Sequence, residues 1–361
     1  MLTNFLSDLG LERSWLISIF AFILVSLIIE IFVPVARRMG LVDKPNHRKQ
    51  HEGVVPLLGG LAIFCGILVL SLILLNPTLD FIFIFSAIAI LVFTGSIDDR
   101  LDIDFRIRLF IQFLAAFVLV VGTQYKITSL GNIFTVGDIS IGWWSNLFTF
   151  LFIAALINAF NMIDGLDGLA GGLAFIGFTV LFAKIGGQMS NELWTLGVLI
   201  LGALAAYLVH NLGFIPKRLS KVFLGDAGSM MLGLIMALFL IKYSQKGSPF
   251  IKPITGLWIV SIPVVDMLAT FIRRMAHGKS PFYADRTHIH HILLRLGFSP
   301  KGALVSLLLA ALLLSIVGLL LEAYSNEAVS FFCFCLFLTL YTLLLLRSWR
   351  IIRYLRKVLK L

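Results

Sequence analysis

Long apolar runs follow one another along almost the whole of this 361-residue chain, and they limit what it can fold into. A helix needs about 20 apolar residues to cross a bilayer, and run after run comes close to that length. The runs are continuous rather than alternating, which argues against a transmembrane β-barrel. Only 13% of the residues are charged, whereas a soluble domain has about 25%. The sequence therefore predicts an all-α polytopic membrane protein.

Polar breaks divide the apolar sequence into about 11 expected transmembrane helices. One such break, "NPTLD" (Asn76–Asp80), combines Pro and Asn as a tight turn does. We expect one integral-membrane domain over 1–361, with a basic cytoplasmic tail at 347–361. The expected spans are 15–36, 57–76, 80–97, 108–124, 144–160, 168–185, 193–210, 225–242, 254–272, 302–321 and 328–346.

Lysine and arginine are distributed unevenly between alternate loops. If the N-terminus lies outside, 23 of the 29 lysines and arginines fall on the inner side. Cytoplasmic loops carry this excess, so we predict a periplasmic N-terminus and a cytoplasmic C-terminus. The net charge of +10 then reflects topology, and no nucleic-acid partner is expected. The same orientation brings all seven histidines and the acidic motifs to the cytoplasmic face, where we expect the active site.

On the outer side, the loop Lys126–Trp143 alternates polar and apolar residues between glycines, which predicts a small hairpin. The first inner loop, "LVDKPNHRKQHEGVVPLLGG", is basic. Its charged residues could contact a lipid phosphate or a nucleotide. The alternative is an ordinary positive-inside loop. The candidates in this loop are Asp43, Lys44, Arg48, Lys49 and His51.

A second inner motif, "DDRLDID", contains four aspartates within seven residues. Adjacent carboxylates repel one another, and a divalent cation or a metal–diphosphate complex would relieve that repulsion. Asp98 and Asp99 adjoin an apolar run and are the better site candidates, whereas Asp102 and Asp104 could simply be solvated. The alternative is an acidic loop paired with its own arginines.

The third motif, "NAFNMIDGLDG", contains Asn158, Asn161, Asp164 and Asp167 between two spans. Its glycines predict that the helix is broken after the asparagines, and irregular backbone at this depth is tolerated where it lines a cavity. A helix junction needs one capping side chain, and four polar side chains exceed that need. We therefore interpret the motif as part of a site.

Two further motifs complete the inner face. In "HNLGFIPKRLSKVFLGDAGS", small residues around Asp226 would let a metal-bound phosphate come close, and Asn211 ends the preceding span. An N-terminal helix cap is the alternative for Asp226.

The motif "SPFYADRTHIHH" is the densest polar cluster. His288 and His291 could share a helix face, but no cysteine or HExxH pattern supports zinc. Diphosphate binding is the better functional interpretation, and a basic surface helix is the alternative. The candidates are Asp285, Arg286, His288, His290 and His291.

Asp266 and Glu30 lie deeper, within predicted spans, where a carboxylate is either functional or paired with a neighbouring span.

Together, the five motifs resemble the polyprenyl-phosphate N-acetylhexosamine-1-phosphate transferase superfamily, which is glycosyl transferase family 4. The resemblance runs from about Met39 to the basic tail and is closest to the N-acetylglucosamine branch, the WecA type. The peptidoglycan branch, the MraY type, shares the aspartate motifs and a histidine cluster. Here "HIHH" stands where that branch has consecutive histidines, and the segment between Asn211 and Asp226 is longer, so both departures favour the N-acetylglucosamine branch.

The resemblance implies the reaction and its components. GlcNAc-1-phosphate passes from UDP-GlcNAc to undecaprenyl phosphate in the bacterial inner membrane, giving undecaprenyl-diphospho-GlcNAc and UMP. This step initiates O-antigen lipopolysaccharide and enterobacterial common antigen synthesis, with Mg²⁺ or Mn²⁺ as cofactor. The sequence leaves the oligomeric state open, with a homodimer as one alternative. The alternatives are transfer of phospho-MurNAc-pentapeptide, or a transporter. A transporter would place its polar breaks near the midplane, often in repeated halves, and neither is seen in this sequence.

The resemblance also suggests roles. Asp226, Asp164 and Asp99 are the expected metal ligands, with Asp167 as a further helper. Asp98 or Asp99 would deprotonate or orient the lipid phosphate. The remaining candidates would bind substrate: the histidines and Arg286 at the diphosphate, the asparagines at the nucleotide sugar, and the first-loop residues at the lipid phosphate or uridine. Direct attack by the lipid phosphate is preferred over an aspartyl intermediate.

Overall fold

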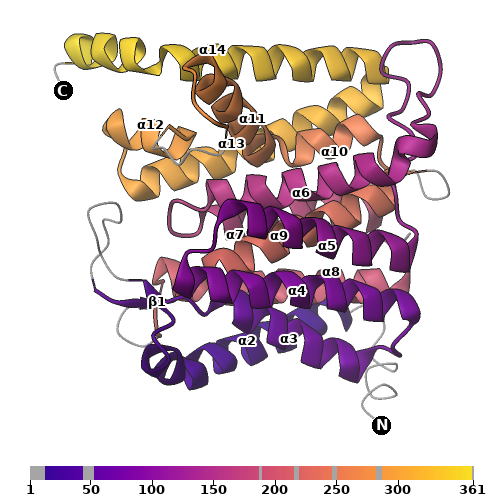
Figure 1. The fold of residues 1–361 in the computed structure, drawn as a ribbon, viewed down its shortest axis with the longest axis vertical. Helices are drawn as coiled ribbons and strands as arrows, with labels where there is room; N and C mark the ends of the chain where they lie inside the picture. Colours follow the sequence, from indigo (N-terminus) through magenta and orange to yellow (C-terminus); the bar gives the residue numbers. More distant parts are fainter. Residues whose placement is uncertain are drawn as a thin grey trace. The chain divides into compact units, whose positions relative to one another are not determined.

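The computed structural model describes residues 13–43, 53–186, 189–214, 219–245, 250–281 and 287–359. Helices dominate these residues (Figure 1), in agreement with the all-α prediction. The elements are α2 (Arg13–Arg38), β1 (Val42–Asp43), β2 (Val55–Pro56), α3 (Gly59–Leu74), α4 (Leu79–Leu101), α5 (Phe105–Thr123), η2 (Gly142–Trp144), α6 (Ser145–Ile163), α7 (Leu169–Ile185), α8 (Asn191–Leu212), α9 (Gly225–Ser244), α10 (Pro253–Ile259), α11 (Ser261–Ala276), α12 (Ile289–Arg295), α13 (Pro300–Tyr324) and α14 (Glu327–Leu359).

The described residues form a multi-pass membrane protein. Eight of the described helices are long and apolar enough to cross a bilayer: α2, α4, α5, α6, α8, α9, α13 and α14. The helices α3 and α7 are apolar but shorter, and α10 with α11 forms a pair bent by 86°. Each of the eleven predicted spans thus coincides with an apolar helix or a bent pair, while the count of eleven spans and the orientation stay predictions.

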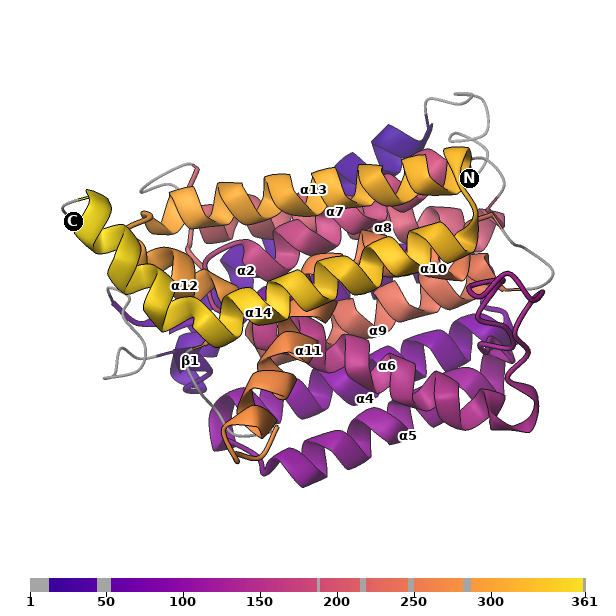
Figure 2. The same ribbon diagram turned by 90° about the horizontal axis from the view of Figure 1, so that it is seen from above.

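The bend between α10 and α11 follows from proline chemistry. Pro263 lies in the first turn of α11 and has no N–H to donate, and its ring crowds the carbonyl four residues earlier, at Ile259. The helix is interrupted there, at Val260. Figure 2 shows α11 turned away from α10. The run 254–272, expected as one span, is therefore two short helices.

The chain packs into two compact units, which we describe separately. Unit 1 comprises Met1–Gln124 and Leu181–Ile235, and unit 2 comprises Tyr125–Val180 and Met236–Leu361. In unit 1, α2 packs against α8 and α3, and α4 packs along α5. In unit 2, α11 packs against α6 and α14, and α10 packs against α13 and α14. The long helix α14, yellow in Figure 1, continues through the predicted basic tail to Leu359.

Glycines in unit 1 allow close helix packing around the start of α9. A Cβ on Gly60 of α3 would lie 2.2 Å from the backbone nitrogen of Gly228, and one on Gly95 of α4 would lie 2.3 Å from that of Ala227. Both distances are far below van der Waals contact. Backbone hydrogen bonds also hold the preceding segment, because Gly59 and Gly60 donate to the carbonyls of Phe223 and Leu224. The first turn of α9 is therefore held on two sides.

Two small β elements occur. β1 and β2 pair antiparallel, with Asp43 opposite Val55, a pairing that the sequence analysis missed. Only a short form of the predicted outer-loop hairpin is present, with one antiparallel bridge between Ser129 and Ser140. Two hydrogen bonds extend it: the Leu130 nitrogen donates to the Ile139 carbonyl, and the Ile139 nitrogen donates to the Gly131 carbonyl.

Candidate functional site

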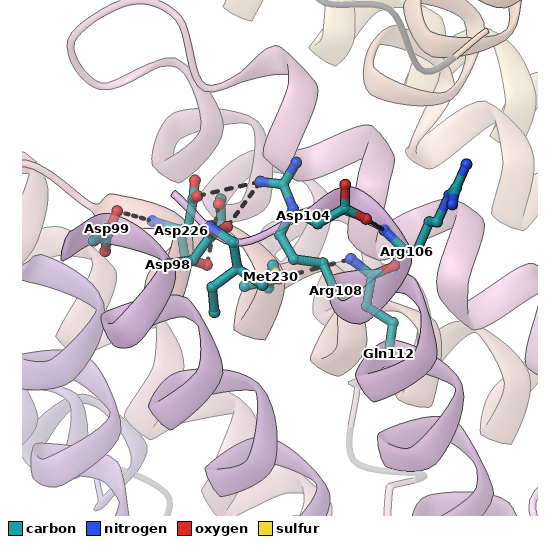
Figure 3. Close-up of polar contacts among 10 residues, drawn as sticks. Asp98, Asp99, Asp104, Arg106, Arg108, Gln112, Asp226 and Met230 are labelled. Carbon is teal, nitrogen blue, oxygen red and sulfur yellow. Dashed lines mark hydrogen bonds and ion pairs between the residues drawn. The ribbon is translucent and has the colours of Figure 1, made fainter. Parts of the chain in front are cut away.

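In unit 1, four side chains from three helices form an acidic cluster, which we define as Asp98, Asp99, Arg108 and Asp226 (Figure 3). Asp98 and Asp99 end α4, Arg108 lies in the first turns of α5, and Asp226 lies in the first turn of α9. The adjacent-aspartate motif and the "GDAGS" motif, 127 residues apart, are therefore brought together as the sequence analysis expected.

Asp98 is a buried carboxylate with both oxygens engaged. Its side chain is 1% exposed; Oδ2 accepts from Arg108 Nη1 at 2.8 Å, and Oδ1 accepts from the Ile103 backbone nitrogen at 2.7 Å. A buried charge is tolerated when it is paired and hydrogen-bonded in this way. Asp98 thereby fixes the guanidinium of Arg108.

Arg108 also reaches the second carboxylate of the cluster. Its Nη1 lies 3.7 Å from Oδ2 of Asp226, whose side chain is one-third exposed. Farther along α5, the buried Gln112 donates to the sulfur of Met230 on α9 at 3.7 Å. One turn of α5 thus lies along the start of α9 (Figure 3). A fixed guanidinium beside an accessible carboxylate is suited to contact phosphate oxygens.

Asp99 caps the start of α9. Its Oδ1 accepts from the Asp226 backbone nitrogen at 2.9 Å, and negative charge is favourable at a helix N-terminus. The approach requires glycine at 225, where φ is +72° and a Cβ would lie 2.4 Å from Asp99 Oδ2. The capping carboxylate at this helix start is thus supplied by Asp99 on α4.

Residues around the acidic cluster hold the loop that leads to it. Asn211, buried at the end of α8, donates Nδ2 to the Val222 carbonyl at 2.9 Å. Glu30, in α2, accepts from the backbone nitrogen and the hydroxyl of Ser220 at 2.7 and 2.8 Å. Glu30 Oε1 also lies 3.5 Å from Nδ1 of His210 on α8, so Glu30 contacts a neighbouring span, one of the two alternatives left open for it. Asp102 and Asp104 are exposed, and Asp104 caps α5 by accepting from the Arg106 nitrogen.

In unit 2, the broken helix has the predicted form. α6 ends at Ile163, Asp164 is its C-cap, and α7 begins at Leu169. Asn158 and Asn161 therefore lie in the last turns of α6, and Asp164 and Asp167 lie in the break. The Asn158 side chain donates to the Ala154 carbonyl at 2.7 Å, while Asp167 is exposed.

A histidine cluster, defined as Asp266, His288, His290 and His291, lies next to this break in unit 2. A Cβ on Gly165 would lie 2.2 Å from Nε2 of His290, so the backbone at 165 is in contact with that ring. The rings of His290 and His291 have centroids 4.2 Å apart, and those of His288 and His290 are nearly parallel. The "NMIDGLDG" and "HIHH" motifs are thus adjacent within this unit.

Asp266 anchors the histidine cluster. Its Oδ2 is 2.6 Å from His288 Nδ1, and its Oδ1 accepts from the Tyr341 hydroxyl at 2.7 Å and the Ile289 nitrogen at 2.9 Å. The carboxylate holds His288 at the N-cap of α12, outside the helix. His288 and His291 therefore do not share a helix face, because the helix starts only at Ile289.

His290 is buried and uncharged at neutral pH. Burial, followed by the charge of neighbouring His291, lowers the pKa of His290 from 6.5 to about 3. Its Nδ1 has no hydrogen-bond partner among the described residues. His290 can therefore offer a hydrogen bond to a ligand, but it does not offer a positive charge.

The described residues include no group of three or more His, Cys, Asp or Glu side chains that could hold a metal. A site for Mg²⁺ does not need one, because the ion is usually bound by one or two carboxylates together with substrate phosphates. The Asp99 carboxylate contacts the backbone of Asp226, and the Asp226 carboxylate itself is one-third exposed. The acidic cluster therefore fits a phosphate-bound Mg²⁺ or Mn²⁺. The histidine cluster includes no cysteine that could serve as a zinc ligand. Cys65 lies in α3, and Cys333 and Cys335 lie in α14.

Comparison with known proteins identifies the family. The model of glycosyl transferase family 4 matches residues 81–244. Three relatives carry the name undecaprenyl-phosphate alpha-N-acetylglucosaminyl 1-phosphate transferase: those of Salmonella typhi, Escherichia coli strain K12 and Yersinia pestis. The Salmonella typhi protein is 40% identical over 96% of this chain and 94% of its own. The Escherichia coli protein is 39% identical over 95% and 93%, and the Yersinia pestis protein is 38% identical over 90% and 89%, in the same order.

The chain belongs to glycosyl transferase family 4. The resemblance inferred from the five motifs is thereby confirmed, and membership of a transferase family favours an enzyme over a transporter. The family 4 match includes the acidic cluster and the broken helix but ends before the histidine cluster.

Within this family 4 chain, the structure adds residues that the sequence analysis did not select. Arg108 was considered only as the partner of a solvated acidic loop, and Tyr341 lies 50 residues beyond the last histidine. No local sequence pattern marks either residue, because each is recognised only by its contact with a buried aspartate: Asp98 for Arg108 and Asp266 for Tyr341. Six candidates lie outside the described residues, and their roles stay predictions: Lys44, Arg48, Lys49, His51, Asp285 and Arg286.

Proposed function

We propose that this protein transfers N-acetylglucosamine 1-phosphate from UDP-GlcNAc to undecaprenyl phosphate, giving undecaprenyl-diphospho-GlcNAc and UMP. The observation that carries the proposal is the name shared by relatives that are 38–40% identical over nearly the full length of both chains. The reaction belongs to the bacterial inner membrane and initiates O-antigen lipopolysaccharide synthesis. Its substrates meet at the cytoplasmic face.

The reaction exchanges one phosphoanhydride for another. An oxygen of the lipid phosphate bonds to the phosphorus that carries GlcNAc, and the bond from that phosphorus to the bridging oxygen breaks, so UMP leaves with the bond's electron pair. Both substrates are anionic, and catalysis of phosphoryl transfer rests on positioning and charge stabilisation. A single displacement needs no covalent enzyme intermediate, and we prefer it.

The acidic cluster is the proposed metal and phosphate site. Asp226 and Asp99 would hold Mg²⁺ or Mn²⁺, which supplies positive charge to the phosphates when bound. Asp164 stays a further predicted ligand. Arg108 would contact a phosphate oxygen, and Asp98 would act as its positioning residue, because both Asp98 oxygens are occupied by Arg108 and Ile103. The preferred acceptor-orienting aspartate is therefore Asp99 rather than Asp98.

The histidine cluster is the proposed diphosphate contact. His288 is held by Asp266 and lies 3.5 Å from the Arg274 guanidinium through its Nε2. His290 would donate a neutral hydrogen bond, and His291 is only partly buried. Asn161, Asp164 and Asp167 would line the nucleotide-sugar site at the neighbouring break.

One assay with paired donors tests the proposal. Purified protein is mixed with undecaprenyl phosphate, Mg²⁺ and either labelled UDP-GlcNAc or labelled UDP-MurNAc-pentapeptide. We expect UMP release and a labelled lipid with UDP-GlcNAc alone. A labelled lipid only from the pentapeptide donor would assign the protein to the peptidoglycan branch, and labelled sugar bound covalently to Asp99 or Asp164 would replace the single displacement.

A further inference from the structure

A polar cavity lies in unit 2 at the start of α14, away from the histidine cluster. It has a volume of about 300 Å³. One wall is Glu327, the first residue of α14, whereas Tyr341, which contacts Asp266, lies about 21 Å farther along that helix. Because α14 crosses the membrane, the cavity belongs to the other face of the protein. By the lysine and arginine distribution, that is the periplasmic face.

The cavity is a built site rather than a surface depression. At its floor, Thr255 is 0% exposed and its hydroxyl has no hydrogen-bond partner among the described residues. An unsatisfied buried hydroxyl costs roughly 1–3 kcal/mol, which a bound polar group would recover. Ser330, 1% exposed, lies beside it and accepts from the Trp258 indole at 3.1 Å.

The walls carry both signs of charge. Lys252 Nζ is 3.2 Å from Glu327 Oε1, and the Glu327 carboxylate, 12% exposed, also accepts from the Asn132 nitrogen at 3.0 Å. Glu322 lies on the same cavity and accepts from the Lys252 backbone nitrogen at 3.2 Å. Lys252 is half-exposed, so its ammonium has donors left for a ligand. A ligand with only negative charge would be repelled by the two carboxylates, and a ligand with only positive charge would be repelled by the lysine. The walls therefore suit a ligand that carries both charges.

The surroundings mark a membrane–water boundary. Tyr324, at the end of α13, is 86% exposed, and the loop that supplies Asn132 ends in the stacked pair Trp143 and Trp144. Exposed Trp and Tyr gather where a protein meets lipid headgroups. Figure 1 shows this loop beside the start of α14.

We propose that this cavity binds the phosphoethanolamine headgroup of a phospholipid in the outer leaflet. The ligand's ammonium would contact Glu322 and Glu327, its phosphate would contact Lys252, and Thr255 would supply a hydrogen bond at the floor. The volume is at the lower end of small-molecule sites, which suits a headgroup whose acyl chains stay in the membrane. The proposal is independent of the sugar-phosphate transfer.

The test uses full-length protein in detergent, depleted of phospholipid, with short-chain phosphatidylethanolamine as the probe. Binding is measured by native mass spectrometry and by the rise in Tm. We expect phosphatidylethanolamine to bind more tightly than phosphatidylcholine, which has no N–H donor, and than phosphatidylglycerol, which has no ammonium. Equal affinity for the three lipids would overturn the proposal, as would free phosphoethanolamine binding as tightly as the lipid.

Two variants and one control locate the binding. Thr255→Val keeps the side-chain shape and should weaken phosphatidylethanolamine about three- to tenfold, the loss of one hydrogen bond. Lys252→Gln, at the half-exposed rim, should weaken it by a similar factor. Ser71→Ala removes another buried hydroxyl without a described partner, but in unit 1, and should change nothing. Transfer activity without phospholipid should be unaffected in all three. Unchanged affinity for phosphatidylethanolamine in both Thr255→Val and Lys252→Gln would exclude the cavity as the binding site.

Discussion

At the residue scale, the informative feature is how each buried carboxylate is held. Asp98 is enclosed by Arg108 and a backbone nitrogen, and Asp266 by His288, Tyr341 and a backbone nitrogen. Asp98 could be selected from the sequence because it adjoins an apolar run. Arg108 could not, because an arginine ten residues away has the same local sequence whether it faces solvent or a buried aspartate.

The Asp98–Arg108 pair should appear as an energetic coupling. Removing one partner leaves the other charge buried and unpaired, which is strongly destabilising. We therefore expect Asp98→Asn and Arg108→Gln to be less destabilising together than the sum of the single variants, by about 1–3 kcal/mol. The measurement is a double-mutant cycle on unfolding in detergent. Strict additivity would contradict the pairing.

At the element scale, glycines decide where helices break and how closely they approach. The break after Ile163 could be predicted because two glycines follow two asparagines, and it forms as expected. The bend at Val260 was not predicted, although Pro263 is its chemical cause. Pro263 marks where the helix is interrupted but does not set the size of the bend, so the 86° angle could not be predicted from the sequence.

Gly165 offers a direct test of the contact between the broken helix and the histidine cluster. A Cβ at this position would lie 2.2 Å from His290 Nε2, so Gly165→Ala must displace the imidazole. We expect transfer activity to fall by about tenfold or more, as for small displacements of positioning groups, with little change in helix content.

Gly256→Ala is the matched control for this contact. Its Cβ would meet its nearest neighbour at 3.4 Å, an ordinary contact within the same unit. Equal activity of Gly165→Ala and Gly256→Ala would show that the contact at His290 has no part in the reaction.

At the scale of the whole molecule, apolar run length and charge distribution determine most of the architecture. Every predicted span corresponds to an apolar helix or, at 254–272, to a bent pair of helices, because about 20 apolar residues have few other stable forms in a bilayer. What the sequence could not provide is the partner of each motif. The motif "GDAGS" meets the adjacent aspartates because helix packing in unit 1 brings together residues 127 positions apart.

Orientation is testable by cysteine labelling. In a variant with Cys65, Cys333 and Cys335 replaced, single cysteines are introduced at Val136 and Phe214, which are 82% and 68% exposed. With a periplasmic N-terminus, a membrane-impermeant maleimide should label Val136→Cys in intact cells. It should label Phe214→Cys only after the membrane is opened. The reverse pattern would invert the topology.

The metal dependence of transfer by Asp226→Asn tests the acidic cluster most directly as the metal site. Labelled lipid is measured from UDP-GlcNAc and undecaprenyl phosphate across a range of Mg²⁺ concentrations, with Asp102→Asn as an exposed control that tolerates its left-handed conformation. We expect Asp226→Asn to insert in the membrane but to lose Mg²⁺-dependent turnover, while Asp102→Asn stays active. Wild-type activity of Asp226→Asn at ordinary Mg²⁺ would contradict the acidic cluster as the metal site.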